Sequence, residues 1–158
     1  MSGYDYASAL EKLTQWSYAE GIEKIILDHN DISYIDWERK SLNFPKLIKI
    51  EGKYPKEIQV YLMLHELGHH QLRKDWEKFA EVLPISYHAE NSKFFDNDKR
   101  FMRRNTYIVS SLEEEYKAWD EGKNLGLSMG IEIDDEKWYD FRAKCLIAYI
   151  RHYANKKP

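Results

Sequence analysis

The chain contains the segment His65–His69, His-Glu-Leu-Gly-His, in which two histidines are separated in the H-E-x-x-H order. Residues four apart lie on one face of an α-helix, so both imidazoles can reach one ion from adjacent turns. Zinc suits these ligands, because its bonds to histidine nitrogen are about 2.0–2.1 Å and imidazole matches its borderline softness. Glu66 can take a proton from a water that the metal polarises and pass it to a leaving amine. The motif therefore predicts a hydrolytic zinc centre with His65 and His69 as ligands and Glu66 as the catalytic base.

The residues around this motif are apolar over much of the circumference of the helix expected from Lys56 to Lys74. Such a helix is buried in the middle of a domain. Two buried histidines would each need a polar partner if they were only core residues, so this spacing, with Glu66 between them, favours a metal.

A catalytic zinc site has three protein ligands and leaves the fourth position to water. One candidate for the third ligand is Asp75, ten residues after His65, the position used by the metzincin pattern. That pattern requires a glycine where this chain has Leu72, so we discount Asp75. His88 is a second candidate, without a spacing rule to support it.

The third candidate is the acidic run Glu113–Glu115 on a long helix expected from Lys99 to Leu125. Successive helical residues are about 100° apart, so at most one of the three is expected to point at the core and the others to face solvent. Glu115 lies between Leu112 and Trp119 on the apolar stripe, where a bare carboxylate would be costly unless paired or metal-bound. We predict Glu115 as the third ligand, with Glu114 as the alternative.

These motifs resemble those of the gluzincin metallopeptidases. The H-E-L-G-H segment is followed, 46 residues after His69, by the E-x-x-A pattern Glu115–Ala118. The closest likeness is to the compact, minigluzincin-like ImmA/IrrE group of metallo-endopeptidases. The resemblance implies a zincin-like fold, Zn²⁺ bound by His65, His69 and Glu115, and Glu66 as general base and acid. It also implies an intracellular endopeptidase that cuts a repressor or another regulator, of a kind often encoded on phages and mobile elements.

Larger gluzincins often carry an aspartate four residues after the ligand glutamate, where it orients a histidine. This chain has Trp119 there and Asp120 one step further. The groups that orient the metal ligands therefore have to differ from that pattern.

The expected elements give an α+β fold in one domain over residues 1–158. Helices are expected at 4–20, 56–74, 75–83, 99–125 and 136–153, strands at 22–27, 32–37 and 47–50, and an irregular connection at 84–98. The segment 46–50, Lys-Leu-Ile-Lys-Ile, alternates in part, which favours an edge strand that could pair with an extended substrate.

Composition narrows the class of protein. The 158 residues carry a net charge of −3, without the basic balance of a nucleic-acid-binding domain, and the cluster formed by Lys99, Arg100, Arg103 and Arg104 is read as a solvated face. No apolar run is long enough to span a membrane and the amino terminus lacks a signal-peptide pattern, so no membrane partner is expected. The single cysteine, Cys145, is read as a core residue and fits a reducing, cytoplasmic location. The sequence leaves the oligomeric state open.

A donor for the developing oxyanion could come from Tyr107, Tyr87 or His88. The leading hypothesis is a zinc-dependent endopeptidase acting on a protein or peptide. The alternative is a zinc-stabilised phage or mobile-element protein that binds or inhibits a partner without turnover, and a weaker third is a metal-free helical domain.

Overall fold

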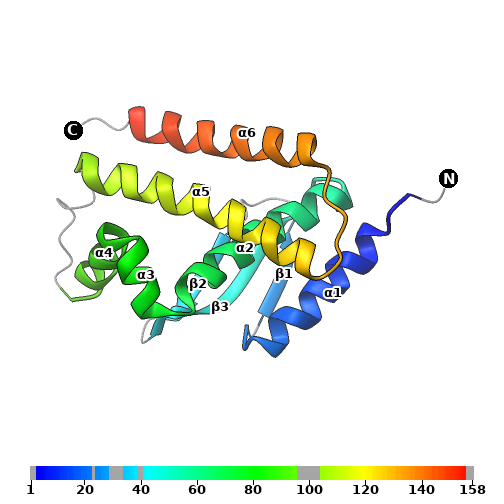
Figure 1. Cartoon of the computed structure of the whole chain (residues 1–158), viewed down its shortest axis with the longest axis horizontal. Helices are drawn as coiled ribbons and strands as arrows, with labels where there is room; N and C mark the ends of the chain where they lie inside the picture. The colour runs from blue at the N-terminus through cyan, green and yellow to red at the C-terminus, as the bar shows by residue number, and fades with distance from the viewer. Residues whose placement is uncertain (1–2, 23, 29–33, 39–40, 96–103, 156–158) are drawn as a thin grey trace.

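The computed structural model describes residues 3–22, 24–28, 34–38, 41–95 and 104–155. Its mixture of helices with one small sheet confirms the α+β prediction (Figure 1). In chain order the elements are α1 (Tyr6–Ala19), β1 (Lys24–Asp28), β2 (Tyr34–Glu38), β3 (Ser41–Glu51), α2 (Lys56–Arg73), α3 (Trp76–Val82), α4 (Pro84–Phe95), α5 (Asn105–Ser128) and α6 (Asp135–Ala154).

Helix boundaries follow local capping chemistry. The Asp5 side chain accepts a hydrogen bond from the Ser8 amide at 3.0 Å and so caps α1. Gly21, with φ of 85°, follows the end of α1 in a conformation that glycine adopts without strain. At α6 the Asp134 side chain accepts a hydrogen bond from the Lys137 amide at 3.0 Å and so caps the helix.

The sheet has the strand order β1-β3-β2, with β1 parallel and β2 antiparallel to β3. The segment 46–50 lies in the central strand, where Lys49 is paired with Ile26 on one side and Tyr34 on the other. The prediction of an edge strand there is wrong, because alternation along a strand indicates which face is buried and not how many neighbours the strand has.

The central strand is also longer than predicted. It begins at Ser41 and runs through the segment 43–45, which lies between the strands predicted at 32–37 and 47–50. Pro45 is accommodated because the ladder with β2 is irregular where Trp37 pairs with it, and a proline lacks the N–H that a regular ladder needs.

Helix α2 lies at the centre of the molecule, in contact with α1, α3, α5 and the strands β2 and β3. Every residue from Gln59 to His70 is buried, so the prediction of a buried motif helix is confirmed. The polar side chains of the H-E-x-x-H motif are therefore held inside the protein.

Two glycines let α2 and α5 touch backbone to backbone. A Cβ atom added at Gly68 would overlap the carbonyl oxygen of Ala118, and one added at Gly122 would overlap the carbonyl oxygen of Leu64. Gly68 lies inside the H-E-x-x-H motif and Ala118 ends the E-x-x-A pattern. The crossing therefore joins the two motifs directly.

The segment 84–98 is not an irregular connection over its described part, because residues Pro84–Phe95 form α4. Proline is favourable in the first turn of a helix. The buried residues Ser86 and Ala89 face the helix bundle, and the Ser86 hydroxyl lies 2.7 Å from the Ser110 hydroxyl of α5. Because these contact residues are small or polar, the sequence shows no apolar stripe from which this helix could be predicted.

The long glutamate-bearing helix starts later than predicted, at Asn105, and continues to Ser128. Lys99, Arg100 and Arg103 of the predicted basic face lie outside the described residues, while Arg104 is exposed just before the helix. Beyond the helix, Gly130 has φ of 74° and supplies the stop.

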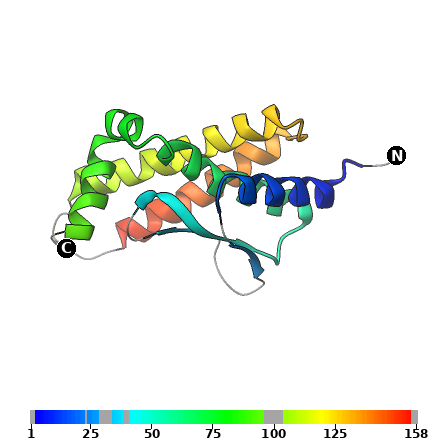
Figure 2. The same cartoon turned by 90° about the horizontal axis from the view of Figure 1, so that it is seen from below.

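Helices α1 and α3 contact α2, whereas α4 and α6 contact α5. Helix α6 runs beside α5, and α3 and α4 lie at the end of the molecule opposite α1 (Figures 1 and 2). Among the described residues, none of the helices combines the length and the apolar character needed to cross a membrane.

Candidate metal centre

The motif histidines lie side by side in the interior of the protein. His65 is 4% and His69 7% exposed, and the centroids of their rings are 4.9 Å apart. Glu66, 4% exposed, lies beside them, and one ligand atom from each of these three residues can be chosen so that all lie within 4.8 Å of one another. A buried group of two imidazoles and a carboxylate with this spacing could hold a metal ion.

Glu115 of α5 reaches the same point from the opposite side. Its Oε2 atom is 2.9 Å from His65 Nε2 and 3.4 Å from His69 Nε2. The side chain is 17% exposed, so this carboxylate is mostly withdrawn from solvent. Two imidazole nitrogens and one carboxylate oxygen therefore converge, which is the donor set that the sequence predicts for the metal.

The convergence of charges shifts the ionisation of these groups. Burial opposes protonation of His69, but the carboxylates of Glu115 and Glu114 outweigh it and raise its pKa to about 10. The pKa of His65 is also raised, because Glu66 and Glu115 outweigh its burial. Burial would raise the pKa of Glu115, yet the two histidines hold it below its usual value. The carboxylates thus favour protonation of both histidines when no metal is bound.

The acidic run departs from the expectation that only one of its members points inward. Glu113 is exposed and lies 3.8 Å from Lys117, as a solvated face predicts. Glu114 is 7% exposed, so it is buried together with Glu115. The reason is that α5 is covered on two sides, by α2 and by α4, so carboxylates 100° apart can both be enclosed.

Glu114 contacts the outer side of His69. Its Oε1 atom is 3.4 Å from His69 Nδ1, 2.8 Å from Arg73 Nε and 2.7 Å from Arg73 Nη2. Sequence reasoning considered Glu114 only as an alternative ligand and missed Arg73. The one signal in the sequence was that Arg73 follows His69 by four residues, on the same face of α2.

Trp119 supports the other histidine. Its ring is fully buried and stacks on the His65 ring with centroids 4.4 Å apart and an angle of 10° between the planes. His65 Nδ1 lies 3.4 Å from Glu66 Oε1. Trp119, four residues after Glu115, therefore holds His65 by stacking.

Helix α6 contributes two further groups that sequence reasoning did not assign to the centre. The Tyr149 side chain, 37% exposed overall, lies near the Glu115 carboxylate, and burial of its phenol together with Glu115 and Glu66 raises the pKa of this group. Cys145, one turn earlier, has its pKa raised to about 12 by burial and by Glu115 and Glu51. Their spacing of four residues was the available signal, but it is equally typical of a core-facing stripe.

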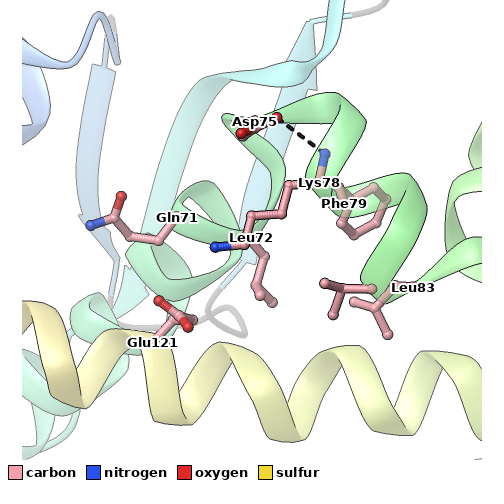
Figure 3. A pocket seen from close by; sticks show the side chains of 8 residues that line it. Gln71, Leu72, Asp75, Lys78, Phe79, Leu83 and Glu121 are labelled. Carbon is pink, nitrogen blue, oxygen red and sulfur yellow. Dashed lines mark hydrogen bonds between the residues drawn. The ribbon is translucent and has the colours of Figure 1, made fainter.

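The remaining candidates lie elsewhere. Asp75 caps α3 by accepting from the Lys78 amide at 3.1 Å, and with Gln71 and Glu121 it lines a pocket of about 60 Å³ between α2, α3 and α5 (Figure 3). His88 is exposed on α4, outside the metal-binding group found among the described residues. Discounting Asp75 is therefore supported, and His88 is not brought to the centre.

Neither aromatic candidate from the sequence replaces Tyr149 as the phenol at the centre. Tyr87 of α4 packs against Trp76 with ring centroids 5.1 Å apart. Tyr107 is near Tyr153, two turns of α5 before Glu115. After burial, Glu115 is the largest cause of the raised pKa of Tyr149.

No protein-family model, curated protein or solved structure matches this chain. What its own residues establish is a buried His65, Glu66 and His69 group able to hold a metal ion, with the Glu115 carboxylate against both imidazoles.

Proposed function

We propose that this protein is a zinc-dependent metallo-endopeptidase of the gluzincin type, similar to the ImmA/IrrE group. The observation that carries the proposal is the contact of Glu115 Oε2 with the Nε2 atoms of His65 and His69, at 2.9 and 3.4 Å. Two imidazoles and a carboxylate, without a cysteine ligand, are typical of hydrolytic zinc enzymes rather than of structural zinc sites.

The residues of the centre divide the chemistry between them. Bound zinc would polarise a water molecule and the scissile carbonyl. Glu66, next to the ligand His65, would take the proton of the attacking water and deliver it to the leaving amine. Tyr149, which lies near Glu115, would donate its O–H to the carbonyl oxygen as negative charge develops there.

The proposed substrate is an intracellular protein, such as a repressor or another regulator, cut at a peptide bond. We propose a cytoplasmic location, in keeping with the unpaired Cys145. Neither a membrane nor a nucleic acid is part of the proposed reaction.

The test combines metal analysis with proteolysis. The purified protein should contain zinc, and a peptide library should reveal cleavage that a chelator abolishes and zinc restores. Replacing Glu66 by Gln should leave the zinc content unchanged and lower turnover by roughly 10²–10⁴-fold, the usual contribution of a general base. Glu115→Ala should release the metal.

Glu113 provides the matched control, because it is exposed and precedes the two buried glutamates. Glu113→Gln and Glu113→Ala should change neither zinc content nor cleavage. A Glu66→Gln variant that cuts as fast as the parent would refute the mechanism. Zinc retained by a parent protein that cleaves no peptide would favour the alternative, a zinc-stabilised binding or inhibitor protein.

A further inference from the structure

Glu114 and Arg73 form a buried ion pair directly behind the metal-binding histidines. Glu114 is 7% and Arg73 5% exposed, and Arg73 Nε and Nη2 lie 2.8 and 2.7 Å from the same oxygen, Glu114 Oε1. Removing two charges from water is costly, and a buried ion pair is weak evidence for stability on its own. The position of this pair therefore calls for a role beyond holding α2 against α5.

That oxygen also contacts His69. Glu114 Oε1 lies 3.4 Å from His69 Nδ1, while His69 Nε2 lies 3.4 Å from the proposed ligand Glu115. The two nitrogens of one imidazole thus face two consecutive glutamates of α5. When the Nδ1–H of an imidazole donates a hydrogen bond to a carboxylate, the Nε2 lone pair is free for a metal and the orientation of the ring is held.

We propose that Glu114 is a positioning residue for the metal ligand His69, and that Arg73 holds the Glu114 carboxylate in place. The proposal rests on the proposed function, in that it takes His69 as a ligand. His65, His69 and Arg73 follow one another at four-residue steps on one face of α2, so the same helix supplies the ligands and the cation behind them.

A further carboxylate steadies the outer end of the arrangement. Arg73 Nη2 lies 3.4 Å from Glu90 Oε1 of α4. The guanidinium is therefore held between α4 and α5. Hydrogen bonds between charged partners are stronger than neutral ones, so a chain of them can hold a ring more rigidly than one contact would.

The two histidines are supported by different means. His65 stacks on Trp119 and meets Glu66 at its Nδ1 atom, so Glu114 serves His69 alone. The glutamate directly before the ligand thus takes the orienting role for one histidine, while an aromatic ring occupies the place four residues after the ligand.

The experiment measures zinc affinity in variants that remove the buried charges in pairs. The double variant Arg73→Met with Glu114→Leu removes the acceptor for His69 together with the cation that pairs with it. The double variant Arg73→Met with Glu114→Gln removes the same charges but keeps an oxygen that can accept from Nδ1. Glu90 loses its contact with Arg73 equally in both double variants. Affinity is measured by competition with a chelator on protein shown to be folded by circular dichroism, and Co²⁺ absorption reports the geometry of the ligands.

The leucine double variant should bind zinc about 10–100-fold more weakly than the parent and show an altered Co²⁺ spectrum. The glutamine double variant should stay within about threefold of the parent. Parent-like affinity in the leucine variant, or an equal loss in both, would overturn the positioning role. Asp120→Asn is the control, because it breaks an exposed ion pair with Arg142 of 3.0 Å between α5 and α6 and should leave affinity unchanged.

If the leucine double variant does not fold, Glu114→Asp decides the question. It keeps the charge for Arg73 but draws the oxygen away from His69, so zinc binding should weaken, and unchanged affinity would overturn the proposal. A parent protein that binds no zinc would refute the proposed function and the positioning role together. A parent that binds zinc but cleaves nothing would refute only the peptidase, and the affinity comparison would still stand.

Discussion

His69 is enclosed by carboxylates, Glu115 at its Nε2 atom and Glu114 at its Nδ1 atom. In the metal-free protein this imidazole is stabilised as a cation, which explains why its pKa rises to about 10 although it is buried. A metal ion entering the centre must displace that proton. Protons would therefore compete with a metal ion for the His69 imidazole.

Zinc binding at pH 7 should release at least about one proton, because the pKa of His69 is raised to about 10 and that of His65 is also raised. Because His69 stays protonated below about pH 10 in the metal-free protein, apparent zinc affinity should rise with pH up to that value. Titration calorimetry in two buffers of different ionisation enthalpy gives the number of protons. A value near zero at pH 7 would contradict the view that His69 exchanges a proton for the metal.

Tyr149 is the second residue whose role can be isolated. Replacing it by Phe removes the proposed oxyanion donor near Glu115, and should lower kcat by roughly 10²–10³-fold with little change in zinc content. Tyr139→Phe on the same helix is the control, because the Tyr139 hydroxyl accepts a hydrogen bond from Lys123. If both variants lose the same activity, Tyr149 has no special part in catalysis.

At the residue scale, the sequence predicted the site residues whose role depends on spacing along one helix. It missed those whose role depends on a contact with another helix. His65, Glu66 and His69 follow from one motif, and Glu115 follows from its position on an apolar stripe. Glu114, Arg73 and Tyr149 acquire their contacts only when α2, α5 and α6 come together, and no local pattern encodes that.

At the scale of elements, the crossing of α2 and α5 determines where the ligands meet. Gly68 lies against the Ala118 backbone, so Glu115, one turn earlier on α5, is brought to the histidines that flank Gly68. The E-x-x-A pattern thus has a physical reading in this chain. Its glutamate is the proposed ligand and its alanine is the contact that allows the approach.

Gly68→Ala should destabilise the protein by about 1–3 kcal/mol or more, the usual cost of overpacking, and weaken metal binding. The added methyl group would meet a backbone carbonyl, so no change of a neighbouring side chain can relieve the clash. Chemical denaturation and zinc titration measure the two effects. Gly3→Ala, at a position with open space around it, should change neither, and a stable Gly68→Ala protein with parent affinity would disprove this account of the crossing.

Elements with a strong apolar period were predictable, and those defined by their neighbours were not. Helices α1 and α2 matched their patterns because each buries its apolar residues, and α6 matched its pattern although Trp138 is its one buried residue. Helix α4 was missed because Ser86 and Ala89 form its contact with α5, and the central position of β3 was missed because strand order is a property of the whole sheet.

Considered as a whole, the molecule encloses several charged groups that a bound metal would help to neutralise. Among them are the carboxylate of Glu66, which is less than a tenth exposed, and that of Glu115, whose side chain is 17% exposed. A ligand that binds only the folded state stabilises it in proportion to the logarithm of its concentration. Metal binding should therefore raise the free energy of unfolding.

Zinc at about 100 times its Kd should add roughly 2.7 kcal/mol of stability. For a chain of this size that corresponds to a rise in Tm of about 5–10 °C. Calorimetry with zinc and with a chelator measures the shift. Glu115→Ala should abolish it and Glu113→Ala should retain it, whereas a zinc-dependent shift that survives Glu115→Ala would move the ligand to another residue.

The contact between Gly68 and Ala118 has a consequence for protein engineering. Two histidines and a glutamate copied onto another pair of helices would remain too far apart, because most interhelical contacts keep backbones separated by side chains. A graft of this centre would have to carry the two small residues along with the ligands, so the smallest transferable unit is the crossing itself.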